Sequence, residues 1–311
     1  MKVLFVCSGN VKKFDISPIV KNQGESLINR EISLDYFGIK GKGFIGYFMN
    51  IFKLKNFISA GNYDIIHGHY SFSGIIASLA TNKPIITSLM GSDINIKYLY
   101  KLIIKIFSKY CWKCTIVKSE SIKNTIGLPD AVVIPNGVDF ERFIPMNKEL
   151  AKKLVNFDQH KKYIIFIADP EREEKNFLLA KTSFGLLKNK NIELYIVFGE
   201  NGIDHNLIPY YINAADVLLL TSKREGSPNV IKEAMACNCP IVSTNVGDVN
   251  SIIGKTNGCY ITSFSPIDIV NKLTLALNFS SRTNGRKNIH YLDNKIIAKK
   301  IIGLYNMILY T

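Results

Sequence analysis

Residues 221–248, TSKREGSPNVIKEAMACNCPIVSTNVGD, decide the fold of this chain. They begin with a polar loop that carries Glu225. Ser227 is then a suitable N-cap, and Pro228 suits the first position of a helix. The predicted helix carries Glu233 and ends before a proline, and the IVSTN that follows is typical of a buried strand. The stretch therefore predicts the loop, helix and strand of an α/β domain.

The start of this helix is a natural place for a phosphate group, because free backbone N–H groups and the positive end of the helix dipole meet there. Glu225 precedes the helix and can reach a group bound at its mouth. Glu233 lies further along and can accept two hydrogen bonds, for example from the hydroxyls of a ribose. This combination suits a nucleotide diphosphate that carries a sugar. The alternative is an ordinary capped amphipathic helix with two solvated glutamates.

The whole string resembles the donor-site signature of the family 4 retaining glycosyltransferases. The matching features are Glu-Gly-small-Pro, then Glu-Ala-Met-Ala, Cys-Pro-Ile-Val and Gly-Asp. The resemblance implies an α/β GT-B fold, with two facing Rossmann-like domains, parallel sheets and an interdomain cleft. It also implies metal-independent, retaining transfer of a hexosyl group from a UDP- or GDP-sugar to an acceptor hydroxyl. No separate cofactor is expected. Glu225 would be catalytic, and the implied donor-binding residues are Gly226, Ser227, Pro228, Asn229 and Glu233.

A charged loop at 169–177 resembles the family's source of two cations for the donor diphosphate. Lys175 stands at the lysine position of that loop. Arg172 lies nearer to it than in the commonest spacing. Two cations at a helix entrance can neutralise the charge of a leaving group. We therefore expect both residues to be catalytic, and the alternative is that both are surface residues of a charged loop.

The length of 311 residues fits two domains. Pro-Asn-Gly at 135–137, followed by a proline at 145, marks a boundary. We expect a first, acceptor-side domain over 1–143 and a second, nucleotide-sugar-binding domain over 144–311. The predicted last helix, 294–310, can cross back onto the first domain in GT-B enzymes.

The first half departs from the family at two loops. The glycine pair often found after the first strand is replaced by Gly24 alone, and the histidine that often faces the transferred sugar is replaced by Met90. The backbone of Gly91 and the carboxylate of Asp93 remain available as contacts. His67 and His69 are either a hydrogen-bonded structural pair or substrate contacts, and a metal site is not expected.

Composition narrows the classes of partner. The net charge of +14 favours polyanions, and without a basic-aromatic recognition motif we expect no nucleic acid. Lysines recur every four residues over Lys97–Lys113, which predicts either an amphipathic helix on an anionic membrane or a solvated lysine face. No apolar run approaches a membrane span, and six cysteines fit reduced thiols. We expect a cytoplasmic protein, peripheral on the inner face of the cell membrane.

The family resemblance implies a place in the assembly of a cell-surface polysaccharide or glycolipid, with a sugar or lipid-linked saccharide as acceptor. A second hypothesis is a catalytically silent GT-B protein that binds a nucleotide or acts as a scaffold. A sugar-nucleotide epimerase would need further acid and base groups. A dinucleotide-dependent dehydrogenase is disfavoured, because no G-x-G-x-x-G follows the first strand.

Overall fold

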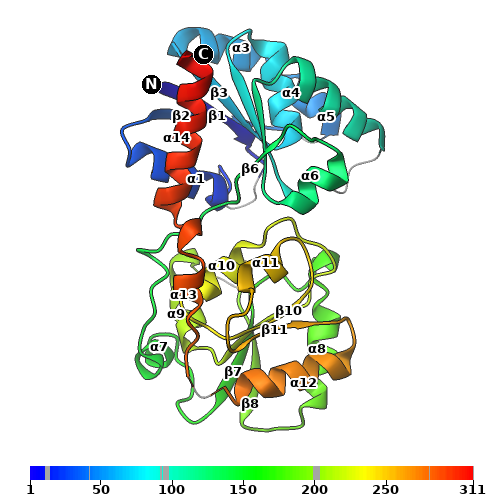
Figure 1. Ribbon diagram of the computed structural model, residues 1–311, viewed down its shortest axis with the longest axis vertical. Coiled ribbons are helices and arrows are strands. Elements are labelled where there is room, and N and C mark those ends of the chain that lie inside the picture. Colours follow the sequence, from blue (N-terminus) through cyan, green and yellow to red (C-terminus); the bar gives the residue numbers. More distant parts are fainter. Residues whose placement is uncertain are drawn as a thin grey trace. The chain divides into compact units, whose positions relative to one another are not determined.

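The computed structural model describes residues 1–10, 15–41, 43–91, 93, 98–198, 204–279 and 281–310 (Figure 1). The chain divides into two compact units. Unit 1 is Met1–Gly137 together with Asn294–Thr311, and unit 2 is Val138–Asp293. The division therefore lies before Val138 rather than after Phe143. The last helix belongs to unit 1, because it packs along the first helix of the chain.

Unit 1 is built on a parallel sheet in the order β2-β1-β3-β4-β5-β6. Its central strands are almost wholly buried, as expected for a parallel sheet with both faces covered. The strands are β1 (Lys2–Ser8), β2 (Ser33–Ile39), β3 (Ile65–His69), β4 (Ile85–Leu89), β5 (Cys114–Val117) and β6 (Val132–Val133).

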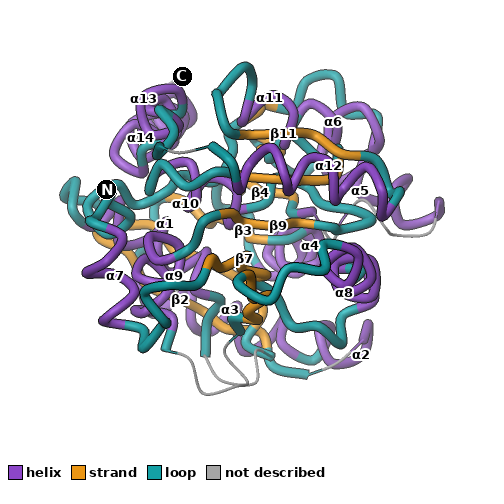
Figure 2. The backbone as a smooth tube through the Cα atoms, turned by 90° about the horizontal axis from the view of Figure 1, so that it is seen from below, coloured by secondary structure: helices purple, strands orange, loops and turns teal. Residues whose placement is uncertain are grey.

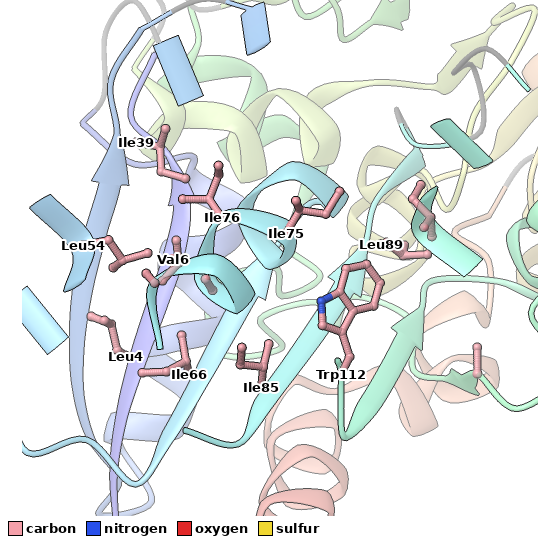
Figure 3. Packing of buried hydrophobic residues seen from close by; sticks show 14 of the residues in the cluster. Leu4, Val6, Ile39, Leu54, Ile66, Ile75, Ile76, Ile85, Leu89 and Trp112 are labelled. Atoms are coloured by element: carbon pink, nitrogen blue, oxygen red, sulfur yellow. The ribbon is translucent and has the colours of Figure 1, made fainter. Parts of the chain in front are cut away.

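The helices of unit 1 cover both faces of this sheet. Leu4, Val6 and Ile66 point into the core beneath α3, α4 and α5 (Figure 3). Phe5 and the strand residues beside it face the other way, toward α1 and α14, which run side by side (Figure 1). The helices are α1 (Pro18–Ile28), α2 (Gly43–Phe48), α3 (Asn50–Gly61), α4 (Ser71–Ala80), α5 (Tyr98–Tyr110), α6 (Glu120–Ile126) and α14 (Asn294–Tyr310).

Unit 2 contains a second parallel sheet, in the order β11-β10-β9-β7-β8. Ile164, Leu219 and Val242 form its core together with residues of α8 and α12. The strands are β7 (Lys162–Phe166), β8 (Ile192–Ile196), β9 (Val217–Leu220), β10 (Ile241–Thr244) and β11 (Cys259–Thr262).

The helices of unit 2 connect these parallel strands, and helices and strands are distinguished by colour in Figure 2. None of the helices in the described ranges of the chain is long and apolar enough to cross a membrane. The α-helices are α7 (Lys148–Leu154), α8 (Phe177–Leu186), α9 (Ile208–Ala214), α10 (Asn229–Ala236), α11 (Val249–Ile253), α12 (Pro266–Leu277) and α13 (Gly285–Asn288). The short 3₁₀ turns are η2 (Glu173–Lys175), η4 (His205–Leu207) and η5 (His290–Leu292).

The two sheets share one strand order. In each sheet the first strand of the unit lies between the second and the third, so the chain reverses its winding direction beside the first strand. Loops at the carboxyl ends of the strands diverge at such a switch point, and ligands of open α/β sheets bind in the crevice that results. In unit 2 the switch point lies between β7 and β9, and the loop after β9 carries Glu225.

Candidate active site

The loops that follow β7 and β9 meet at an ion pair. Lys175, in η2, donates from its Nζ to Glu225 Oε1 at 2.6 Å. The side chains are only 17% and 14% exposed, so solvent screens the pair less than it screens a surface salt bridge. Ser222 Oγ donates to the same carboxylate oxygen at 2.8 Å. The structure thus brings together two predicted site residues and adds Ser222, which the sequence analysis missed.

Hydrogen bonds to backbone carbonyls hold these two loops against each other. Thr221 Oγ1 donates to the carbonyl oxygens of Lys175 at 3.1 Å and Asn176 at 3.0 Å. The amide of Lys223 donates to the Glu174 carbonyl at 2.8 Å. The Lys175–Glu225 pair is therefore supported on both sides by a fixed backbone.

Arg172 does not join this pair. Its Nε donates to Glu174 Oε1 at 2.8 Å, and the arginine side chain is 56% exposed. A neighbouring carboxylate only two residues away competes for the guanidinium, which explains why it turns aside. Of the two cations expected at the diphosphate, the structure places only Lys175 beside Glu225.

Helix α10 begins one residue later than predicted. Pro228 is its N-cap, with φ −69° and ψ 120°, and Asn229 is the first helical residue. The prediction that Ser227 caps the helix is wrong, because its hydroxyl donates to Asp248 Oδ2 at 2.6 Å instead. This bond ties the loop before α10 to the loop after β10.

The same two loops also approach through their backbones. Gly247 has φ +58°, and a Cβ atom at this position would lie 2.6 Å from the carbonyl oxygen of Gly226. Only glycine meets both conditions without strain. The backbone of Gly226, a predicted donor contact, thus lies directly against the backbone of Gly247.

Glu233 lies one turn inside α10 and is half-buried. Burial raises the pKa of its carboxyl group to about 7, while the charges of Arg142 and Lys232 act in the opposite direction. Arg142 comes from the segment just after the start of unit 2, within the stretch 135–145 that the sequence marks only as a domain boundary. Its approach to Glu233 depends on the fold and left no local signal.

Lys232 is a second residue that the sequence analysis missed. It is completely buried, and burial lowers the pKa of its ammonium group to about 8, against the charges of Asp248 and Glu233. Burial also raises the pKa of Asp248, and Lys232 and the Ser227 hydroxyl oppose that shift. Its sequence neighbours gave no signal of burial, since a lysine next to a glutamate in an amphipathic helix also fits a solvated face.

Two hydrogen-bond acceptors at the site have no partner among the described residues. They are Asn229 Oδ1 and Asp248 Oδ1, and both atoms are buried. Buried acceptors normally receive a hydrogen bond, so donor groups of a bound molecule could satisfy both. Within the ranges that the structure describes, no three His, Cys, Asp or Glu side chains form a cluster suited to a metal ion.

Gly24, predicted as a contact of the first domain, lies inside α1 rather than in a loop. A Cβ atom there would lie 1.9 Å from the hydroxyl oxygen of Tyr36. A side chain at this position would meet the Tyr36 ring of β2, so the contact predicted for Gly24 would have to come from within a helix rather than from a loop.

The loop after β4 is closed by Asp93, which is fully buried. Its Oδ1 accepts from the Ser71 amide at 3.2 Å, and its Oδ2 accepts from the Met90 amide at 2.7 Å. Asp93 therefore positions this loop. The prediction that its carboxylate is available to a ligand is wrong, because both oxygens accept hydrogen bonds from backbone amides. Met90 and Gly91 are half-buried, while Ser92 of the same predicted loop lies outside the described residues.

The histidine pair on β3 has two different environments. His67 Nδ1 lies 2.6 Å from the Tyr305 hydroxyl, and its Nε2 lies 2.8 Å from Ser88 Oγ. His69 stacks on His67 with ring centroids 4.4 Å apart, and neither of its nitrogens has a hydrogen-bond partner among the described residues. Burial lowers the pKa of both rings, that of His67 to about 3, so both are neutral. His67 is thus the structural member of the pair.

Comparisons with known proteins agree with this architecture. Residues 13–142 match the family model described as Glycosyltransferase Family 4, and residues 161–278 match the model described as Glycosyl transferases group 1. Alr3699/HepE from Anabaena, solved in complex with UDP and glucose, superposes with a TM-score of 0.77 at 15% identity, over 98% of this chain and 99% of that one. This likeness confirms the predicted GT-B fold of two Rossmann-like domains.

Two curated relatives are glycosyltransferases by name. TuaC of Bacillus subtilis, named for teichuronic acid biosynthesis, is 26% identical over 62% of this chain, and the alignment spans 56% of its own length. The UDP-Gal:alpha-D-GlcNAc-diphosphoundecaprenol alpha-1,3-galactosyltransferase of Escherichia coli is 23% identical over 94% of this chain and 89% of its own. Together with the two matching family models, these relatives show that the chain belongs to the family 4 GT-B glycosyltransferases.

Proposed function

We propose that the protein transfers a sugar from a nucleotide-diphosphate sugar to an acceptor hydroxyl, with retention at the anomeric carbon and without a metal ion. The observation that carries the proposal is the Lys175–Glu225 ion pair at the switch point of unit 2. It places a cation and a carboxylate next to the start of α10, where a phosphate is favoured.

In this proposal the donor diphosphate lies at the first turn of α10, close to Gly226 and Asn229, and Lys175 supplies its counter-charge. Glu233 accepts hydrogen bonds from the ribose hydroxyls. The buried acceptors Asn229 Oδ1 and Asp248 Oδ1 offer further sites for hydroxyl or amine donors. A UDP-sugar is the favoured donor, and the UDP in the Anabaena structure supports that choice.

The reaction exchanges one bond at the anomeric carbon for another. The bond to the diphosphate oxygen breaks, and the nucleoside diphosphate leaves with the electron pair. The acceptor oxygen bonds to the same face of the anomeric carbon, and its proton passes to the departing phosphate oxygen. Lys175 stabilises the charge that develops on the leaving group, a type of contribution that is usually large in enzymes.

Glu225 has two roles in this scheme. Before the donor binds, it holds Lys175 in position, and Ser222 in turn holds its carboxylate. Once the diphosphate shares the ammonium group of Lys175, the carboxylate of Glu225 is free to accept a hydrogen bond from a hydroxyl of the transferred sugar.

We further propose that the acceptor is a saccharide or lipid-linked saccharide of a cell-surface polysaccharide or glycolipid, at the cytoplasmic face of the membrane. The names of the two relatives support this assignment, since one refers to teichuronic acid and the other to a diphosphoundecaprenol substrate.

A donor screen tests the proposal. The purified protein is incubated with UDP-, GDP- and ADP-sugars in EDTA, with and without membrane extract, while thermal shift and nucleotide release are measured. We expect one donor to stabilise the protein and to be turned over when extract is present, and the anomeric configuration of the product, read by NMR, to match the donor. Glu233→Ala should abolish the shift, and Glu193→Ala, which removes a surface carboxylate paired with Lys161, should leave it unchanged.

Other outcomes discriminate among the alternatives. A donor that binds but is never turned over would favour the silent, nucleotide-binding protein. Turnover that EDTA abolishes and Mg²⁺ restores would contradict metal independence. An inverted product would contradict retention.

A further inference from the structure

Helix α5 has two apolar sides, and only one of them is used by the fold. Ile104 is buried in the core of unit 1. On the opposite side, apolar residues recur at intervals of three and four, which places them along one stripe of the helix. These residues are between 45% and 83% exposed, and they are Tyr98, Leu99, Leu102, Ile106 and Tyr110.

A second group of exposed apolar side chains lies where α2 meets α3. Leu54 and Ile58 of α3 face the core, so the fold does not need the outer side of this helix to be apolar. Helix α2, the junction and the start of α3 nevertheless carry large hydrophobic residues that are between 50% and 75% exposed, namely Ile45, Phe48, Met49 and Phe52.

Both groups belong to one layer of helices. The ring of Phe72, in α4, lies 5.9 Å from that of Tyr47 in α2 and 5.6 Å from that of Tyr100 in α5. Helix α4 therefore sits between the two groups, and residues of α3, α4 and α5 pack into the same core of unit 1. We call the nine exposed residues named in the two preceding paragraphs the outer apolar surface of unit 1.

Lysines without acidic neighbours border this surface. Residues 43–61 and 98–113 contain no Asp or Glu, yet they include Lys53, Lys55, Lys101, Lys105, Lys109 and Lys113. None of these lysines forms an ion pair with a carboxylate among the described residues. Lys97, the first lysine of the predicted stripe, lies outside those residues.

Apolar side chains bordered by lysines match the chemistry of an anionic bilayer, where acyl chains and phosphates lie within a few ångströms of one another. A second copy of the chain fits less well. A symmetric dimer would place the same surface on both partners and bring their lysines together.

We propose that the outer apolar surface seats unit 1 on an anionic phospholipid bilayer. Its apolar residues enter the boundary between headgroups and acyl chains, and the lysines of α5 contact lipid phosphates. The α2–α3 junction provides a second point of contact, which fixes the orientation of unit 1 more firmly than α5 alone. The inference does not depend on the proposed reaction, because membrane docking needs no donor.

Vesicle flotation tests the proposal on the full chain without nucleotide sugar. The protein is mixed with vesicles of phosphatidylcholine alone or with phosphatidylglycerol added. We expect binding to the anionic vesicles only. A charge variant, K105Q/K109Q/K113Q, should lower the partition coefficient about 100-fold, given that each lysine near an anionic surface contributes about a factor of five. The matched control, K181Q/K190Q/K255Q, removes three exposed lysines of unit 2 and should bind as the wild type does.

An apolar variant, L99S/L102S/I106S, separates insertion from charge attraction. It should lose binding by roughly tenfold or more at constant charge. Its control is L178S/I267S/L275S, which changes three residues of unit 2 with comparable exposure. Thermal melting identifies any variant that fails to fold, and the charge variant then still tests the proposal.

Three results would overturn the inference. The first is that the wild-type protein does not bind anionic vesicles. The second is that vesicle binding falls equally in the variants and in their controls. The third is that light scattering shows a dimer which the apolar variant dissociates. Because no donor is present, each of them leaves the proposed reaction untouched.

Discussion

Lys175 and Glu225 are separated by 50 positions in the sequence, and their side chains share a hydrogen bond of 2.6 Å. The charge that would stabilise a leaving diphosphate is therefore already balanced by a carboxylate of the protein. A partly buried cation without a partner would cost free energy, and a carboxylate at this distance reduces that cost. The pair thus keeps a cation ready at the switch point of unit 2.

Replacing Lys175 by Met should lower turnover of the donor about 10²- to 10³-fold, because it removes a preorganised stabiliser of developing charge. The protein should also lose stability, since Glu225 keeps only its bond from Ser222. Adding Glu225→Gln to this variant should restore part of the stability but none of the turnover. Nucleotide release and urea unfolding measure the two effects, and turnover within twofold of the wild type would rule out the role of Lys175.

Replacing Gly247 by Ala should destabilise unit 2 by about 2 kcal/mol, because the added Cβ meets the Gly226 carbonyl at 2.6 Å and the backbone has φ +58°. Donor binding should weaken at the same time, since Gly226 must move. Gly185→Ala is the matched control. It lies in α8 with nothing within 4 Å of the added atom, and it should be neutral or stabilising. Equal effects of the two substitutions would contradict the close approach.

Donor affinity should increase as the pH rises through about 7, because Glu233 must be ionised to accept two hydrogen bonds and its pKa is about 7. Stability should change in the opposite direction. The folded protein holds the carboxyl proton of Glu233 more tightly than the unfolded chain does. The contribution of Glu233 to the free energy of unfolding is therefore lost as the pH rises from 4.5 to about 7. Glu233→Gln should remove both dependences. Calorimetric titration and urea unfolding at several pH values measure them, and a donor affinity that does not vary with pH would contradict this assignment.

Tyr305→Phe should destabilise unit 1 by about 1–3 kcal/mol, because it leaves Nδ1 of the buried His67 without its partner. In the wild type the low pKa of His67 means that the unfolded chain binds a proton more readily than the folded one. Its contribution to stability is therefore lost as the pH falls from 6.5 to about 3. Tyr310→Phe, at an exposed position of the same helix, is the control. Urea unfolding with both variants at neutral pH and at pH 4 checks the prediction.

Periodicity and helix signals predicted much of the fold. The last helix, Asn294–Tyr310, has the predicted bounds. It is a strongly patterned amphipathic segment, and the period of such a pattern indicates where a helix begins and ends. The donor signature also placed Glu225 and Glu233 on the correct loop and helix.

Residues whose role depends on a distant partner could not be predicted in the same way. Ser227 has the side chain of an N-cap, but Asp248 takes its hydroxyl. Asp93 is predicted to be available to a ligand, but the backbone amides of Ser71, in α4, and Met90, in its own loop, occupy its carboxylate. Arg172 turns to Glu174 because that carboxylate is closer than the site. In each case the choice between partners is made by the packing of loops, which a linear pattern does not contain.

The assignment of α14 to unit 1 has a consequence for synthesis on the ribosome. Tyr305 supplies the partner of His67 in β3, so this buried hydrogen bond forms only after the far end of the chain has been made. Unit 2, by contrast, is one continuous segment, Val138–Asp293, and all of its strands are available before α14 leaves the exit tunnel. The part of the chain that is translated first therefore finishes folding last, and a ribosome that stalls between the two events holds a finished unit 2 beside an open unit 1.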